Sequence, residues 1–292
     1  MSRVELFSRR ACLPAEARRA KVGAARLPLT IVALSLVLLA AIGWKSGPGA
    51  LVLLAAGLAA ETPKSAPSAP DDKAPAAPEP SAYEPTSAYT IREIEGWKVY
   101  VHNRLLGEKK DLGYETLKLL AVHLYDINRM VPRPALDKLH AVPIWVEAGN
   151  PKVECMCYHP SRGWLEGHGF NPEKAGAVEL GNPVTFFDWT HHQRAMVLHE
   201  LTHAYHHQVL GYDNPDIKAA YQAAMKSKSY ESVLFYTGIK KRAYACNSDQ
   251  EYFAELTEAY FSTNDFYPFV RPEIQEFDQA GFKMLKKVWG KP

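Results

Sequence analysis

The pattern of apolar and polar positions between residues 89 and 186 predicts several strands and one long helix. Residues Trp97 to Leu105 alternate with the two-residue period of a half-buried strand. Residues Leu112 to Met130 instead have the period of an amphipathic helix, which ends ahead of Pro132. Further strands are predicted at three short apolar runs: Val142 to Glu147, Val153 to Tyr158 and Ala177 to Leu180.

The pattern becomes helical in the last third of the chain. Helices are predicted from Asn214 to Lys226, from about Asp249 to Phe261 and from about Glu273 to Trp289. The aromatic residues between Asn264 and Pro272 are expected to pack within this helical part rather than to bind a substrate. Strands followed by helices predict an α+β fold.

Between these two parts lies the sequence HELTHAYHH, His199 to His207, which we expect on a helix. Thr190 to Gln193 has the form of a capping box, and Gly211 is placed to end the helix. On a helix, His199 and His203 lie one turn apart on the same face, so both imidazoles can bind one metal ion.

This spacing is typical of a hydrolytic zinc site. A zinc ion with three protein ligands keeps a fourth position for water and lowers the pKa of that water, and a nearby carboxylate then takes the proton. Glu200 fits the role of that base. His206 and His207 are expected to continue a surface run, because no glycine breaks the helix to bring a third histidine back to the metal.

A third ligand is expected downstream, on the helix that begins after Ser248. Glu251, Glu255 and Glu258 fall at successive turns of one face of that helix. One carboxylate can complete the ligand set, and another can hydrogen-bond a ligand histidine. A phenol near the metal would stabilise the oxyanion formed when an amide carbonyl is attacked, and Tyr244 is the main candidate. Tyr230 and Tyr236 compete with it for this role.

The motif HELTH, followed by a tyrosine, six residues, a glutamate, three residues and a second glutamate, resembles a known family. It is similar to the gluzincin metallopeptidases of the anthrax lethal factor type, which include bacterial proline-specific secreted endopeptidases. The resemblance covers Gly181 to Ser262. It implies a zincin-like domain, in which a small mixed sheet and the active-site helix precede a mainly helical lower lobe.

The resemblance also implies a role for each residue of the motif. These roles are zinc ligands at His199, His203 and Glu251, a general base at Glu200, an oxyanion-stabilising phenol at Tyr244, and a carboxylate at Glu255 that hydrogen-bonds a ligand histidine. By the same resemblance, Ala177 to Leu180 would be the edge strand along which an extended peptide pairs. The alternative is an ordinary edge strand without a substrate.

The N-terminal 60 residues predict an export signal or a membrane anchor. A basic segment, residues 1 to 26, precedes an apolar run from Leu27 to Trp44, so the basic end is expected on the cytoplasmic side. A second apolar run, Ala50 to Ala60, is too short to span a bilayer alone, and cleavage after Ala60 would remove both runs. Residues 61 to 88 form a Pro- and Ala-rich tether, and residues 89 to 292 the catalytic domain.

Charge and cysteine content add two expectations. The formal net charge of +2 and the absence of a basic stripe with stacking aromatic residues give no case for a nucleic-acid partner. If the domain is exported, a disulfide between Cys246 and either Cys155 or Cys157 is conceivable. Cys155, Cys157 and His159 superficially invite a second zinc ion, but no fourth partner lies at a usual spacing.

Together these features predict a zinc endopeptidase that acts outside the cytoplasm, secreted or membrane-anchored, with one zinc ion per chain and a peptide or protein substrate. Two alternatives stay open. One is a zinc hydrolase of a non-protein amide in the cell envelope, and the other is a non-catalytic extracellular binding module on a zincin scaffold. The intact HExxH sequence weighs against a binding module, which has no need of Glu200. The pattern does not indicate an oligomeric state.

Overall fold

A computed structural model describes residues 83–290 and has the predicted α+β architecture, a mixed sheet with helices. The predictions for residues 1–60 and for residues 61–82 of the tether lie outside this range. Within the described range, no helix has the length and apolar character needed to cross a membrane.

The main sheet has five strands in the order β1-β2-β3-β5-β4. The central strands β2, β3 and β5 are parallel, and β1 and β4 are antiparallel edge strands. Their bounds are β1 Tyr89–Ile94, β2 Trp97–His102, β3 Ile144–Val146, β4 Met156–Tyr158 and β5 Val178–Leu180.

The sheet order corrects one expectation. Ala177 to Leu180 was predicted as the edge strand beside the active-site helix, but β5 lies inside the sheet with hydrogen bonds to both β3 and β4. All three of its residues are buried, as is typical of an interior strand. The edge strand on this side is β4, which returns antiparallel to β5 and packs against α7.

The sheet and the helices of the N-terminal part share one apolar core. Helix α3 (Lys110–Met130) contributes Leu120, Leu124 and Ile127, which pack with Trp97 and Val99 of β2. The other helices of this part are α4 (Arg133–His140), α5 (Arg162–Gly167) and α6 (Pro183–Trp189), with short 3-10 turns at Thr86–Ala88, Asn103–Leu105 and Pro172–Lys174.

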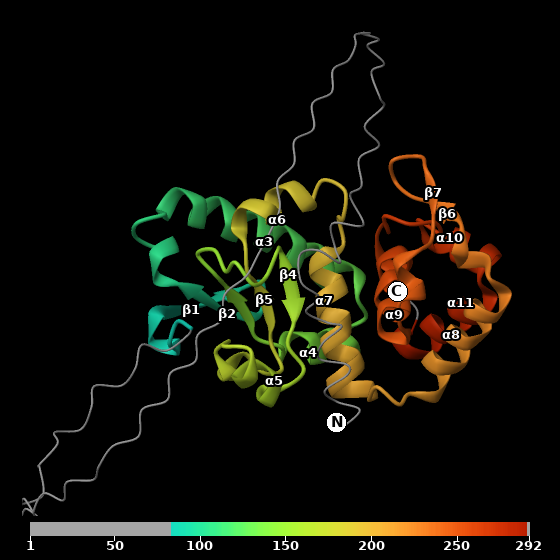
Figure 1. Cartoon of the computed structure of the whole chain (residues 1–292), viewed down its shortest axis with the longest axis horizontal. Helices are drawn as coiled ribbons and strands as arrows, with labels where there is room; N and C mark the ends of the chain where they lie inside the picture. The colour runs from blue at the N-terminus through green and yellow to red at the C-terminus, as the bar shows by residue number, and fades with distance from the viewer. Residues whose placement is uncertain (1–82, 291–292) are drawn as a thin grey trace, which may run out of the picture. The chain divides into compact units, whose positions relative to one another are not determined.

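Helix α7 (Met196–Tyr205) stands between the sheet and the C-terminal helices, since it packs against both β4 and α9 (Figure 1). It continues as a π-helical turn, His206–Leu210, and stops at Gly211, where φ is 76°. The C-terminal elements are α8 (Pro215–Ser227), the pair β6 (Val233–Leu234) and β7 (Lys240–Lys241), α9 (Asp249–Phe261), α10 (Arg271–Phe277) and α11 (Gln279–Trp289). Short 3-10 turns lie at Ser229–Glu231 and Tyr244–Cys246.

Two helix boundaries differ from the prediction. The helix expected from Glu273 to Trp289 is divided at Asp278, whose carboxylate accepts a hydrogen bond from the backbone N–H of Gly281 and so starts α11. The capping box at Thr190 to Gln193 is absent, because Thr190 closes α6 and α7 begins after Ala195 without a side-chain cap. The stop at Gly211 is confirmed.

Candidate metal centre

Helices α7 and α9 bring together His199, His203 and Glu251, which we call the α7–α9 cluster. Oε2 of Glu251 lies 3.1 Å from Nε2 of His199 and 3.5 Å from Nε2 of His203. One ligand atom from each side chain lies within 4.8 Å of the other two, and all three residues are buried. Two imidazoles and one carboxylate are a common donor set for a catalytic metal ion with an open position, so this cluster can hold a metal.

The position of Glu251 follows from the way α9 begins. Ser248 is the N-cap residue, and its hydroxyl accepts a hydrogen bond from the backbone N–H of Glu251 at 3.1 Å. This cap places Glu251 in the first turn, where the helix dipole also favours a negative charge. The helix start predicted after Ser248 is therefore confirmed, and the cap places the third donor in the first turn of α9.

The second ring nitrogen of His199 has its own carboxylate partner. Nδ1 of His199 lies 2.6 Å from Oε1 of Glu258, a buried side chain two turns after Glu251. Such a contact fixes the tautomer and the orientation of a ligand histidine, and leaves Nε2 directed at the metal position. The sequence assigned this supporting hydrogen bond to Glu255, and the structure gives it to Glu258.

Glu255 nevertheless lies in the same buried region. With His199 and Glu258 it forms a second, overlapping group of possible ligand atoms within 4.8 Å of one another. Glu251, Glu255 and Glu258 share one face of α9, so sequence spacing alone does not separate Glu255 from Glu258. The packing of α7 on α9 is what brings Glu258 to Nδ1 of His199. The spacing of the three residues identified the face, and only the three-dimensional contact selects Glu258.

The charges within the cluster support its use as a cation site. Burial opposes the charged form of Glu251, but the charge of His203 and hydrogen bonds from both histidines outweigh burial and hold the pKa of Glu251 well below its usual range. Burial also opposes protonation of His199, yet its hydrogen bonds to Glu251 and Glu258 hold its pKa well above the usual range. Glu251 is therefore an anion that attracts positive charge to this position.

Strand β4 holds the carboxylate of Glu200. The backbone N–H of Tyr158 donates a hydrogen bond to Oε2 of Glu200 at 2.9 Å, and Glu200 is 3 % exposed. A carboxylate that is oriented in this way can exchange a proton with a molecule bound beside it. This contact was not predicted, since no local spacing relates Tyr158 to the helix motif.

Of the three candidate tyrosines, Tyr244 is the one that contacts the cluster. Its hydroxyl donates a hydrogen bond to Oε1 of Glu251 at 3.3 Å. The two competing tyrosines lie elsewhere, because Tyr230 donates to Asp278 inside the C-terminal core and Tyr236 is 44 % exposed and stacks on His192. Tyr244 is therefore the phenol best placed to donate a hydrogen bond within this site.

Glu200 and Tyr244 line one small pocket together with His199. Its volume is about 30 Å³, which is enough for one or two water molecules. The lining residues are Trp189, Gln193, Met196, His199, Glu200, Tyr244 and Glu258. Three of the residues that the sequence selected for chemistry, His199, Glu200 and Tyr244, thus face a common space, which His203 and Glu251 do not line.

The two later histidines of the motif are not a simple surface run. His206 is fully buried against Phe253 and Tyr212, and neither of its ring nitrogens has a hydrogen-bond partner. Burial, followed by the neighbouring positive charges, lowers the pKa of His206 to about 3. His207 is partly buried, with Nδ1 2.8 Å from the hydroxyl of Tyr158. The prediction of a surface position is wrong for His206.

The three cysteines of the described range form no disulfide, so neither conceivable pairing of Cys246 is present. Cys155 and Cys157 also lie in different environments. Sγ of Cys155 is 3.3 Å from the sulfur of Met196, whereas Sγ of Cys157 is 3.5 Å from Nε2 of His159.

Comparisons of this chain with protein-family models, with curated proteins and with solved structures find no match. The resemblance to gluzincins stays a prediction that rests on the motif and on the residues gathered around it.

Proposed function

We propose that this protein is a zinc-dependent endopeptidase. The observation that carries the proposal is the α7–α9 cluster in contact with Tyr244, beside a pocket that His199, Glu200 and Tyr244 line together. A buried His₂Glu donor set beside a held carboxylate and a phenol has the chemical groups that amide hydrolysis requires.

Zinc is the proposed metal because two imidazoles and one carboxylate suit it and leave a coordination position open. His199, His203 and Glu251 would hold the ion, and Glu258 would orient His199 through its Nδ1. When bound, zinc would supply a Lewis acid that polarises a carbonyl group and lowers the pKa of water.

Glu200 would act as the general base and then as the general acid. Its carboxylate would accept a proton from the attacking water and pass that proton to the leaving amine. The hydrogen bond from Tyr158 N–H supports this role, because it limits the orientations that the carboxylate can adopt. The hydroxyl of Tyr244 would leave its long hydrogen bond to Glu251 and donate a hydrogen bond to the oxyanion instead.

An extended peptide is the proposed substrate, as the resemblance of the motif to the gluzincin metallopeptidases implies. Backbone hydrogen bonds at Cys155 and His159 are directed to β5, so the alternation along β4 directs the N–H and C=O groups of Met156 and Tyr158 away from the sheet, to the outer edge of β4. Met156 and Tyr158 are fully buried there and the N–H of Tyr158 is bonded to Glu200, so this edge packs against α7 and is not open to an added strand.

We also propose that the domain acts outside the cytoplasm. The support is the basic segment followed by the apolar run from Leu27 to Trp44, ahead of a Pro- and Ala-rich tether. These segments lie outside the described residues.

The test is metal content and peptide cleavage for the purified protein and its Glu200→Gln variant. We expect zinc in both proteins, cleavage of a mixed peptide library by the first, and a loss of at least about 100-fold in turnover in the second. Glu108→Gln, at a surface carboxylate, is the matched control and should cleave normally. A Glu200→Gln variant that cleaves at the full rate would refute the mechanism.

Two further outcomes separate the alternatives. Hydrolysis of envelope amides without peptide cleavage would favour the non-protein hydrolase. Retained zinc without Glu200-dependent turnover of either substrate class would favour the binding module.

A further inference from the structure

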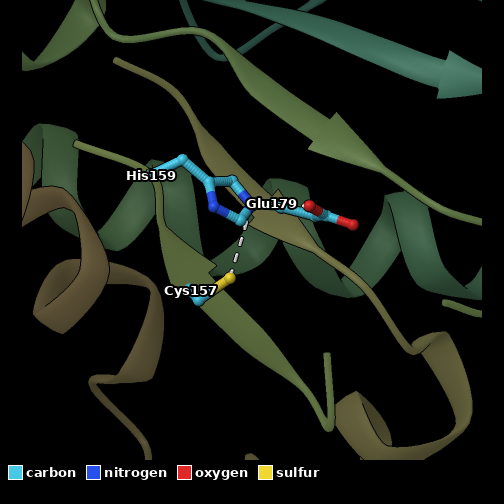
Figure 2. A group of neighbouring side chains, drawn as sticks. All are labelled: Cys157, His159 and Glu179. Atoms are coloured by element: carbon cyan, nitrogen blue, oxygen red, sulfur yellow. Dashed lines mark hydrogen bonds and ion pairs between the residues drawn. The ribbon is translucent and has the colours of Figure 1, made fainter. Parts of the chain in front are cut away.

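A second group of possible metal ligands lies on the other face of strand β4. Cys157 is on β4, His159 follows its last residue, and Glu179 is on β5, where it is the register partner of Cys157 (Figure 2). We call these residues the β4–β5 cluster. Cys157 packs with Leu165 and Phe170, whereas its neighbours on β4 belong to the core that contains α7. The cluster is therefore separate from the α7–α9 cluster.

Both partners of His159 approach the same ring nitrogen. Nε2 of His159 is 2.6 Å from Oε2 of Glu179 and 3.5 Å from Sγ of Cys157. A catalytic triad needs the carboxylate at one nitrogen of the imidazole, where it orients the ring, and the nucleophile at the other, where it gives up its proton. Because Cys157 and Glu179 both approach Nε2, this cluster does not have the geometry of a triad. One N–H also cannot serve two acceptors well, whereas a cation at this position would contact all three donors.

The distances suit a zinc ion. With Zn–S of about 2.3 Å and Zn–N of about 2.0–2.1 Å, a tetrahedral site separates sulfur from nitrogen by about 3.5–3.6 Å, as at Cys157 and His159. The carboxylate of Glu179 would have to move away from His159 by less than about 1 Å to reach a ligand position. All three donors are buried and lie within 4.8 Å of one another.

The surrounding residues orient Glu179 and balance its charge. Oε1 of Glu179 accepts hydrogen bonds from Asn150 at 2.7 Å and from Lys174 at 3.0 Å, so Oε2 is the oxygen directed at His159. Lys174 also pairs with Glu147 at 2.5 Å, and these two charges offset each other. A thiolate at Cys157 and the carboxylate of Glu179 then carry the two negative charges that a divalent ion neutralises.

A cavity adjoins the residues that hold Glu179, although Cys157, His159 and Glu179 themselves do not line it. Its volume is about 520 Å³, and it is lined by Asn150 and Lys174, the two residues that hold Glu179, as well as by Glu147 and Phe170.

We propose that Cys157, His159 and Glu179 form a second zinc site that fastens the edge strand β4 to β5. A thiolate and an imidazole select zinc over magnesium or calcium, which prefer oxygen donors. The site has a consequence for the first one, because the residue between Cys157 and His159 is Tyr158, whose N–H holds Glu200. The second ion would keep β4, and with it Glu200, in position.

Cobalt substitution separates the two sites. The α7–α9 cluster has no sulfur donor, so a thiolate-to-cobalt charge-transfer band in the near ultraviolet reports the β4–β5 cluster alone. The full-length protein, stripped of metal and titrated with Co²⁺, should develop this band. The band should be lost in Cys157→Ser and kept in His203→Ala/Glu251→Ala. Cys155→Ala is the matched control, because this nearby buried cysteine contacts Met196 instead, and it should keep the band.

Zinc content gives the second readout. We expect two zinc ions per chain in the unchanged protein, one in Cys157→Ser and one in His203→Ala/Glu251→Ala. One ion that is lost only with His203→Ala/Glu251→Ala would overturn the second site and leave the proposed function intact. One ion that is lost only with Cys157→Ser would support the second site and remove the metal from the proposed function. A cobalt-loaded unchanged protein without a thiolate band overturns the proposal even if Cys157→Ser fails to fold.

Discussion

The backbone N–H of Tyr158 donates a hydrogen bond to the carboxylate of Glu200, and this contact joins the edge strand to the helix that carries two of the possible metal ligands. The relationship matters because the donor is a main-chain group. A side-chain substitution at residue 158 removes the ring and leaves the donor, so only a proline there removes the donor itself.

Tyr158→Pro should therefore lower turnover more than Tyr158→Ala. Both variants lose the buried ring, but only the proline leaves Glu200 without its N–H partner, and the ladder to β5 does not use this N–H. A hydrogen bond to a charged group is worth about 1.5–3 kcal/mol, so we expect kcat to be lower by about 10-fold or more in the proline variant. Steady-state peptide cleavage measures this, with zinc content as the control for folding. Equal kcat values for the two variants would show that this N–H does not position Glu200.

Glu258→Gln should weaken zinc binding more than Glu255→Gln. Glu258 makes the short hydrogen bond to Nδ1 of His199, and the loss of such a partner commonly costs about 10–100-fold in metal affinity. Competition with a chelator of known affinity measures the change. If Glu255→Gln has the larger effect, Glu255 supports the histidine as the sequence first indicated.

Tyr244→Phe should lower kcat by about 100-fold and leave KM nearly unchanged. The phenol is proposed to donate to the oxyanion, which exists only after the carbonyl is attacked, so its loss affects the transition state more than the bound substrate. Tyr236→Phe is the control, because that ring is exposed and stacks on His192. A rise in KM alone would assign Tyr244 to substrate binding.

His206 should make the fold sensitive to mild acid. Its pKa is lowered to about 3 in the folded protein by burial and by neighbouring charges, so below pH 6.5 the unfolded chain takes up a proton that the folded chain does not. This contribution to the free energy of unfolding is fully present above pH 6.5. It is lost as the pH falls from 6.5 toward 3, at up to about 1.4 kcal/mol per pH unit.

Denaturant unfolding at a series of pH values tests this. The slope of stability between pH 6.5 and 5 should be smaller in His206→Leu than in the unchanged protein. At pH 7 the leucine variant should be at least as stable, because the replacement removes two buried nitrogens without partners and keeps the apolar contacts with Phe253. Identical pH slopes would mean that His206 does not titrate differently in the two states.

The sequence predicted the parts of the site that depend on short spacings. His199, Glu200 and His203 are fixed by one helix, and Glu251 by the cap at Ser248, so local rules were sufficient to place each of them on its element. That α7 and α9 would pack together is a long-range relationship, and it was expected from the need for a third metal ligand and from the resemblance to a known family.

The errors arise where distant segments meet. The choice between Glu255 and Glu258 depends on how α7 packs on α9, and the edge position of β4 depends on a strand order that no single segment encodes. The same limit applies to the β4–β5 cluster. Cys157 and His159 were visible as a pair, but their third partner, Glu179, is supplied by strand pairing rather than by sequence spacing.

The distribution of the donors of the α7–α9 cluster along the chain has a consequence for biosynthesis. Both histidines are on α7, and the third donor lies on α9, which is made only after α8 and the β6–β7 pair. A growing chain therefore lacks a complete donor set until most of the domain has left the ribosome. Under the proposed function, a chain exported before it folds would acquire its metal and its hydrolytic activity only outside the cytoplasm. Proteins inside the producing cell would then not be cleaved by it.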